Sequence, residues 1–204
     1  MAFINEDKET GQKRLTRIFI AIDLPDQVKD EIENSYKNIS SDKKIRIRWI
    51  PKKNLHMTLK FLGAVSEKQI EKICETLKDL KLNMDSELFT HSYGLFPLKG
   101  IPKIFWVSFK ENNKNELSDL FEMIEQSLEP LGFQKEKRRF VPHVTIARLK
   151  ISGNSELKDF HRVMERYNEK FKSISKQSFP VKKITLFKSE LQPGGAVYSK
   201  IMEF

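Results

Sequence analysis

Cysteine is almost absent from this chain of 204 residues, in which Cys74 is the single example. One thiol excludes a disulfide within the chain and any zinc cluster built on cysteines. We therefore expect a protein of a reducing compartment, with the cytoplasm as the default location. Cys74 falls on the apolar face of an expected helix, which favours core packing over a role as a nucleophile.

Long apolar runs are absent as well. No run approaches the roughly 18 apolar residues of a membrane-spanning helix, so we expect no association with a membrane. Residues 1–14 are polar and of mixed charge, without the apolar core of a signal peptide, and we expect a flexible tail there. Residues 15–204 are long enough for one bilobal domain.

Glycine is also scarce, and its placement excludes several nucleotide-binding and catalytic motifs. The eight glycines form neither a P-loop nor a dinucleotide-binding pattern, and no serine sits in a nucleophile elbow. Positive charge, in contrast, is abundant: 37 Lys and Arg against 28 Asp and Glu give a net charge of +9. That excess favours polyanionic partners, but a merely soluble, lysine-rich surface fits it equally well.

The order of predicted elements occurs twice along the chain. Each unit reads as strand, helix, histidine-bearing strand, helix and strand. The units begin near Phe19 and Phe105, which are 86 residues apart, and their histidine strands are 87 residues apart. The expected strands are 18–23, 45–49, 55–62 (closed by Gly63), 89–96, 104–109, 141–149, 181–187 and 198–204; the expected helices are 26–39, 66–80, 117–128 and 157–171. Two such units most simply pack as two lobes around a pseudo-two-fold axis.

Each histidine-bearing strand contains a His-x-Thr-x motif, His56-Met-Thr58-Leu and His143-Val-Thr145-Ile. Residues i and i+2 of a strand share a face, so each motif presents one imidazole and one hydroxyl together. By the same alternation Lys60 is expected beside His56 and Thr58. Strict alternation puts Arg148, five residues after His143, on the opposite face, although a bend at the end of the strand could return it to the phosphate.

Two imidazoles and two hydroxyls suit phosphoryl chemistry. Histidine titrates near neutral pH, so one imidazole can act as general base and the other as general acid. Threonine hydroxyls can donate to phosphate oxygens. One His-x-Thr is common by chance, whereas two at matching positions of matching units are not. His91 and His161 lack such a context, and we interpret both as structural.

Charged and aromatic residues near the motifs allow other sites. Neither motif contains a carboxylate, and the nearest acidic residues are Glu67 and Glu136, so we expect no metal and no cofactor. The basic segment 135–139 suits an RNA backbone, but a solvated loop is the preferred interpretation. Aromatic residues near the motifs could stack on a base, although core packing is favoured for each of them; these are Trp49, Phe61 and Phe140.

Both motif segments resemble the paired signatures of the 2H phosphoesterase superfamily. Residues 54–63 (NLHMTLKFLG) and 139–148 (RFVPHVTIAR) are most similar to its RNA 2′,3′-cyclic phosphodiesterase branch, also called 2′-5′ RNA ligase. Residues 17–25 resemble the opening strand of that branch, and the similarity runs from about residue 15 to residue 204. Met57 and Lys60 are mild departures from the usual pattern.

The resemblance implies an α+β, bilobal fold whose two pseudo-two-fold-related lobes have antiparallel sheets lining a central cleft, with helices outside. It implies metal-independent hydrolysis of a terminal RNA 2′,3′-cyclic phosphate to a 2′-phosphomonoester. His56 would then be the proton donor and His143 the proton acceptor. Thr58, Thr145 and Arg148 would bind substrate.

The sequence is also compatible with other functions. Some members of the branch also join RNA ends by the reverse reaction without ATP. A non-catalytic RNA-binding module and a 2′-5′ oligonucleotide phosphodiesterase are the alternatives. The expected partner is RNA or a nucleotide with a terminal 2′,3′-cyclic phosphate, and the expected state is a monomer.

Overall fold

The computed structural model describes residues 15–37, 47–80, 82, 84–112, 115–172, 178–193 and 195–204. Residues 1–14, where a flexible tail is expected, lie outside these ranges, and that expectation stays a prediction.

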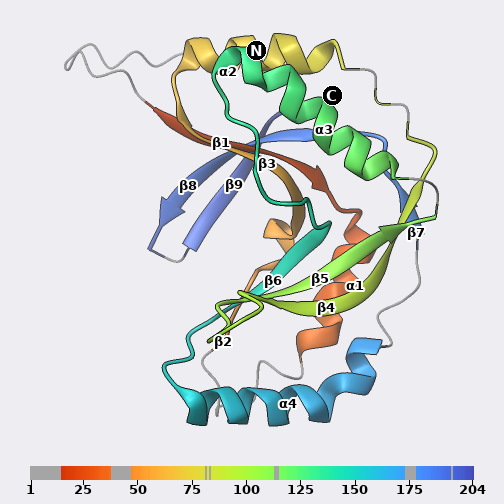
Figure 1. Ribbon diagram of the computed structural model, residues 1–204, viewed down its shortest axis with the longest axis vertical. Helices are drawn as coiled ribbons and strands as arrows, with labels where there is room; N and C mark the ends of the chain where they lie inside the picture. Colours follow the sequence, from red (N-terminus) through yellow and green to blue (C-terminus); the bar gives the residue numbers. More distant parts are fainter. Residues whose placement is uncertain are drawn as a thin grey trace.

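The strands of the described residues form one curled antiparallel sheet (Figure 1). Its order is β7-β4-β5-β6-β3-β1-β8-β9, and β2 pairs with β6. The strands are β1 (Thr16–Asp23), β2 (Ile47–Trp49), β3 (His56–Val65), β4 (Glu87–Phe96), β5 (Ile104–Glu111), β6 (His143–Leu149), β7 (Ser178–Pro180), β8 (Thr185–Gln192) and β9 (Gly195–Glu203). The two motif strands, β3 and β6, therefore lie side by side at the centre.

Helices cover the outside of this sheet in two pairs. They are α1 (Asp26–Lys37), α2 (Glu67–Lys78), α3 (Glu116–Leu128) and α4 (Asn154–Lys172), with short 3₁₀ helices η1 (Lys52–Asn54) and η2 (Glu129–Leu131). Figure 1 shows α2 and α3 together over the β1–β3 half, and α1 and α4 at the other end beside β4 and β5. The bilobal α+β architecture is thus confirmed.

The two lobes are not the two sequence repeats, which corrects our expectation. The last strand of the first repeat, β4, pairs with β5 of the second. Conversely, β8 of the second repeat pairs with β1 of the first. Each half of the sheet is therefore built from both repeats. The opening strand of each repeat, β1 or β5, pairs with the last strand of the other repeat, β8 or β4. The two halves are therefore connected by the exchanged strands β4 and β8 as well as by the pairing of the central strands β3 and β6.

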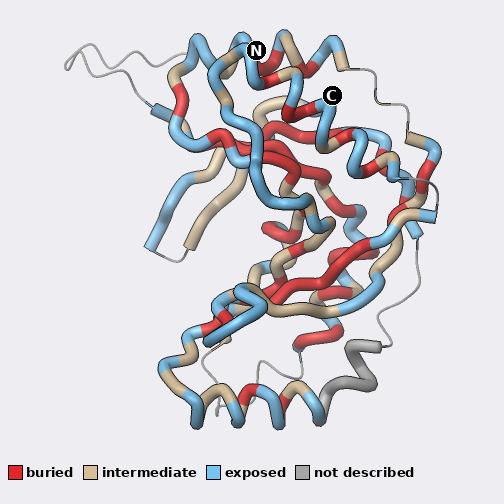
Figure 2. Tube along the Cα trace, in the orientation of Figure 1, coloured by how far each residue is buried: buried red, intermediate tan, exposed pale blue. Residues whose placement is uncertain are grey.

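One continuous apolar cluster lies between the sheet and the helices. Met57 and Val144, at the centre of the sheet, are fully buried in it. Figure 2 shows the same distribution, with buried residues along the central strands and exposed residues on the outer sides of the helices. Cys74 is buried on α2 within this cluster, as expected from its position.

Most strand boundaries differ by a few residues from the sequence prediction, and two of these differences have a clear structural cause. Gly63 does not end β3; it takes a left-handed conformation (φ 77°) at a register shift opposite Ile18, and the strand continues to Val65. The apolar run 181–187 is extended only from Thr185, although Val181 and Ile184 are buried in the core. Ile184 still exchanges backbone hydrogen bonds with Phe204, whereas Val181 is buried outside the strand, and burial alone gave it the sequence pattern of a strand residue.

Candidate active site

The two motifs meet at one backbone pair. Met57 of β3 lies opposite Val144 of β6 in an antiparallel register. The positions on either side of this pair place His56 beside Thr145 and Thr58 beside His143. Since Met57 and Val144 point into the core, these four side chains share the other face of the sheet, which we call the motif face.

A bulge follows the threonine in each motif strand. Thr58 pairs with Ala21 and Lys60 with Ile20, so Leu59 has no partner of its own on β1. Likewise Thr145 pairs with Trp106 and Ala147 with Phe105, which leaves Ile146 as the extra residue. Side-chain alternation reverses at each bulge, and both strands show the same sequence of burial.

These bulges overturn three expectations from the sequence. Arg148 is exposed on the motif face, the side of His143, whereas strict alternation put it on the opposite face. Lys60 is buried on the core side and does not stand beside His56. Phe61 takes its place on the motif face with 76% of its surface exposed, so the core-packing interpretation of Phe61 is wrong. Pattern counting fails here because a one-residue insertion shifts every later side chain.

The other two aromatic residues do pack as expected. Trp49 stacks on Tyr36 at 4.3 Å between ring centroids, and Phe140 stacks on Phe121 at 4.5 Å. The basic segment 135–139 has no regular secondary structure and is exposed.

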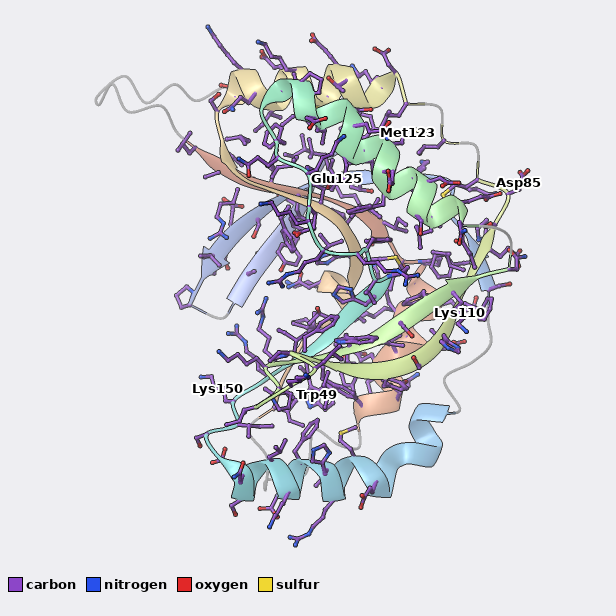
Figure 3. The ribbon with its side chains drawn as sticks, in the orientation of Figure 1. Trp49, Asp85, Lys110, Met123, Glu125 and Lys150 are labelled. Carbon is purple, nitrogen blue, oxygen red and sulfur yellow. The ribbon has the colours of Figure 1, made fainter. Side chains whose placement is uncertain are left out.

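Lys60 instead belongs to a buried ion pair behind the motif strand. Its ammonium donates to Glu125 Oε2 at 2.7 Å and to the Gln134 carbonyl at 2.9 Å. The same carboxylate oxygen accepts from the backbone N–H of Glu136 at 2.9 Å. Figure 3 labels Glu125 on α3, and its side chain is 5% exposed. The pair thus ties β3 to α3 and to the segment that leads into the second motif.

Both imidazoles are oriented in the same way. His56 Nδ1 lies 2.7 Å from the carbonyl oxygen of Asn54, and His143 Nδ1 lies 2.7 Å from that of Val141. A carbonyl can only accept, so Nδ1 carries the proton in each ring. Nε2 is then free to accept a proton, or to donate one once the ring is protonated.

Aromatic rings surround each histidine. His56 lies 4.8 Å from Phe19 and 5.1 Å from Tyr198 between ring centroids. His143 lies 5.3 Å from Phe96 and 5.8 Å from Trp106. Each imidazole is therefore held between apolar walls that come from other strands of its own half of the sheet.

This burial makes both imidazoles weak bases. Burial lowers the pKa of His56 to about 4, against opposing effects of the Asn54 carbonyl and Asp23, while Lys29 and His143 lower it further. Burial also lowers the pKa of His143, partly offset by the Val141 carbonyl. Both rings are thus neutral at pH 7 in the free protein, and an anion between them would favour protonation of one.

The strands beside the two motifs carry different polar groups. Asp23 of β1 is the cross-strand partner of His56, and Ser108 of β5 is that of His143. Asp23 accepts from Lys29 and, at 2.8 Å, from Lys200. Burial raises the pKa of Asp23, but these two partners outweigh it and hold that pKa below its usual value. Sequence reasoning missed Asp23 because only strand pairing relates it to His56.

Other candidate sites do not coincide with the motifs. A pocket of about 320 Å³ lies between β4, β5 and α4, and it contains neither motif histidine. Within the described ranges, no three His, Cys, Asp or Glu side chains are grouped to hold a metal ion. No helix in the described part of the chain is long and apolar enough to cross a membrane.

Comparison with known proteins identifies relatives over nearly the whole chain. A Methanocaldococcus jannaschii protein named RNA 2′,3′-cyclic phosphodiesterase is 36% identical, over 92% of this chain and 99% of its own. An Archaeoglobus fulgidus protein of the same name is 30% identical over the same shares. Among solved structures, TT0787 of Thermus thermophilus has a TM-score of 0.71 at 22% identity, covering 92% of this chain and 96% of its own. Escherichia coli LigT with 3′-AMP has 0.68 at 20%, covering 93% and 97%.

A family model described as LigT-like phosphoesterase matches the chain twice, at residues 22–106 and at residues 107–198. Each match contains one His-x-Thr-x motif, which supports the internal repeat read from the order of elements. The two matches together cover most of the sequence. This chain therefore belongs to the LigT-like phosphoesterase family.

Proposed function

We propose that this protein hydrolyses the terminal 2′,3′-cyclic phosphate of RNA to a 2′-phosphomonoester. The observation that carries the proposal is the placement of two neutral imidazoles, with free Nε2 atoms, on one face of adjoining strands. The names of the M. jannaschii and A. fulgidus relatives, which align over nearly their whole length, support the substrate.

The proposed reaction uses the imidazoles as an acid–base pair. His143 Nε2 accepts a proton from water as the water oxygen bonds to phosphorus. His56, protonated on Nε2, donates its proton to the leaving 3′-oxygen as the P–O3′ bond breaks. Water thus supplies the new P–O bond, the 2′-ester is retained, and the two rings end with their protonation exchanged.

The remaining side chains of the motif face would bind the substrate. Thr58 and Thr145 would donate to the non-bridging phosphate oxygens and would offset charge that develops during attack. Arg148 would contact phosphate, since its guanidinium forms paired hydrogen bonds to such groups. Phe61, exposed beside Phe19 at 6.0 Å, would stack on the nucleobase. No step requires a metal.

The weak basicity of the rings fits this scheme. An anionic phosphate between two desolvated imidazoles stabilises one imidazolium, so substrate binding itself would supply the protonated His56. The reverse reaction, 2′-5′ joining of RNA ends without ATP, follows from the same groups by microscopic reversibility. We also infer that the protein acts as a monomer in the cytoplasm.

The test is turnover of a mononucleoside 2′,3′-cyclic phosphate with EDTA present, with the product resolved as 2′- or 3′-phosphate. We expect the 2′-phosphate, and a loss of at least about a hundredfold in His56→Ala and in His143→Ala. A 3′-phosphate product would reverse the leaving oxygen and overturn the scheme.

RNA binding that survives in both variants without any turnover would favour the non-catalytic module. Cleavage of 2′-5′-linked oligonucleotides in preference to cyclic phosphates would favour the other alternative. The intact second imidazole argues against the binding module, since binding alone has no use for two oriented histidines.

A further inference from the structure

Two arginines face each other at one end of the motif face. Arg48 of β2 is the cross-strand partner of Arg148 of β6. Cross-strand partners share a face, with their β-carbons about 5 Å apart. Both side chains are exposed. Because Arg148 lies on the motif face beyond the bulge, Arg48 lies there too.

Like charges in directly opposed positions of a sheet repel each other. An anion that accepts hydrogen bonds from both side chains turns this repulsion into attraction. Guanidinium groups suit a phosphodiester especially well, because their planar N–H groups match two of its oxygens. The pair therefore has the charge and the geometry of a phosphate-binding subsite.

Arg48 is positioned by the β8–β9 hairpin. A β-carbon added to Gly195 would overlap the Arg48 guanidinium, so this group lies directly against the Gly195 backbone. Gly195 has a φ of 129°, which only glycine adopts readily. Next to it, Asn54 Nδ2 donates to the Ala196 carbonyl at 2.8 Å. The start of β9 is thereby fixed against η1 and β2, on the other half of the sheet.

The arginine pair lies one step away from the reacting phosphate. Arg148 comes three residues after Thr145 on β6, and Gly195 comes three residues before Tyr198, whose ring contacts His56. At about 3.3 Å per residue, both separations are about 10 Å. Two different strands thus place the backbone of Arg148, and the Gly195 backbone that the Arg48 guanidinium contacts, beside the motif positions but not among them. The group of an RNA chain at that position is the next phosphodiester, on the 5′ side of the terminal nucleotide.

We propose that Arg48, together with Arg148, forms a second phosphate subsite that binds the phosphodiester 5′ to the terminal nucleotide. This subsite makes the protein prefer RNA ends to mononucleoside cyclic phosphates. The inference rests on the proposed function, because it places the RNA chain relative to the two histidines.

Three substrates and one pair of variants test it. The substrates are a mononucleoside 2′,3′-cyclic phosphate, a dinucleotide with the same terminus, and that dinucleotide with an uncharged methylphosphonate in place of its internal phosphodiester. The variants are Arg48→Gln and, as a matched control, Arg162→Gln on α4, where Arg162 pairs with Asp159 at 3.0 Å. The quantity compared is kcat/KM for each combination.

We expect the wild-type protein to prefer the dinucleotide to the mononucleotide about tenfold or more, and to lose that preference with methylphosphonate. Arg48→Gln should lower the rate on the dinucleotide about tenfold, and on the mononucleotide by a much smaller factor. On the methylphosphonate dinucleotide the same substitution should have no larger effect than on the mononucleotide. Arg162→Gln should behave as wild type on all three.

The opposite results overturn the proposal. Equal wild-type rates on the charged and methylphosphonate dinucleotides would show that no group reads this phosphate, whatever Arg48→Gln does to folding. An equal loss of kcat/KM on all three substrates in Arg48→Gln would show that Arg48 only supports the hairpin. In that case Arg48→Lys should restore no preference for the charged dinucleotide. If the wild-type protein fails to turn over even the mononucleotide, the proposed function fails first. Turnover of the mononucleotide and the dinucleotide at equal kcat/KM would contradict the second phosphate subsite and leave the proposed function intact.

Discussion

Asp23 lies directly opposite His56 in the β1–β3 ladder, whereas the matching position opposite His143 holds Ser108. This difference breaks the symmetry of a site whose two motifs are otherwise alike. The Asp23 carboxylate raises the pKa of His56, against the larger effect of burial. The negative group beside His56 acts in favour of protonating that ring, and the neutral group beside His143 has no such effect, although burial still lowers the pKa of His56 to about 4.

Asp23→Asn should therefore weaken His56 as an acid. Lys29, which already lowers the pKa of His56, would then lack its carboxylate partner, and the pKa of His56 should fall further. Activity requires protonated His56, so the high-pH limb of the kcat profile should move to lower pH. The loss in kcat should be small near pH 5 and grow towards pH 8. Initial rates on a mononucleoside cyclic phosphate across this range measure it.

Ser108→Ala is the matched control at the equivalent position. The Ser108 hydroxyl hydrogen-bonds with Ser92 and not with a charged group. The high-pH limb of the kcat profile should therefore stay where it is in Ser108→Ala. A shift of the low-pH limb in Asp23→Asn, with the high-pH limb unmoved, would instead make His56 the base.

The low pKa of His56 also predicts how stability depends on pH. The folded-state pKa of about 4 lies below the unfolded value of about 6.5. Between these values the unfolded chain binds more protons, so the stabilisation is complete above about pH 6.5 and is lost as the pH falls towards 4. His56→Asn removes this contribution. Urea unfolding at pH 7.5 and pH 4.5 should show a smaller difference in the variant, and an equal difference would place the acid sensitivity elsewhere.

The sequence predicted the elements and the meeting of the two motifs far better than the side-chain directions. Apolar alternation and helical spacing located the central strands and the four helices, because those segments bury one side. Arg148, Lys60 and Phe61 were misplaced because a bulge leaves no mark in the apolar pattern: Ile146-Ala147 reads as ordinary strand. The exchange of β4 and β8 between the halves was also invisible, since pairing partners are set by the tertiary fold and not by local composition.

Loss of the buried Lys60–Glu125 pair should strongly destabilise the fold. Lys60→Met leaves Glu125 buried without a counter-charge; in the described structure its Oε1 already has no hydrogen-bond partner. Removing one member of a buried pair costs about 3–5 kcal/mol. The midpoint of urea unfolding should fall accordingly at an unchanged slope.

Two further variants separate charge from packing. The double variant Lys60→Met with Glu125→Leu should recover much of the stability, because no unpaired charge stays buried. Lys183→Met, which removes an exposed ion pair of 3.3 Å with Glu203, should change stability by less than about 1 kcal/mol. If Lys60→Met were as mild as Lys183→Met, solvent would have to reach Glu125, and the pair would not anchor the segment before His143.

Phe61 offers a test of substrate binding that folding should not obscure. Its ring is 76% exposed on the motif face, so Phe61→Ala should change the free energy of unfolding by no more than about 0.5 kcal/mol. Stacking of a base on an aromatic side chain is worth about 1–3 kcal/mol. The KM for a cyclic nucleotide should therefore rise about tenfold while kcat changes little, because the histidines and threonines are untouched. Leu98→Ala, which removes a side chain 84% exposed in the β4–β5 loop, should leave both constants unchanged. An unchanged KM in Phe61→Ala would mean that the base lies elsewhere, and Phe61→Tyr, which keeps the ring, should then behave no differently from the alanine variant.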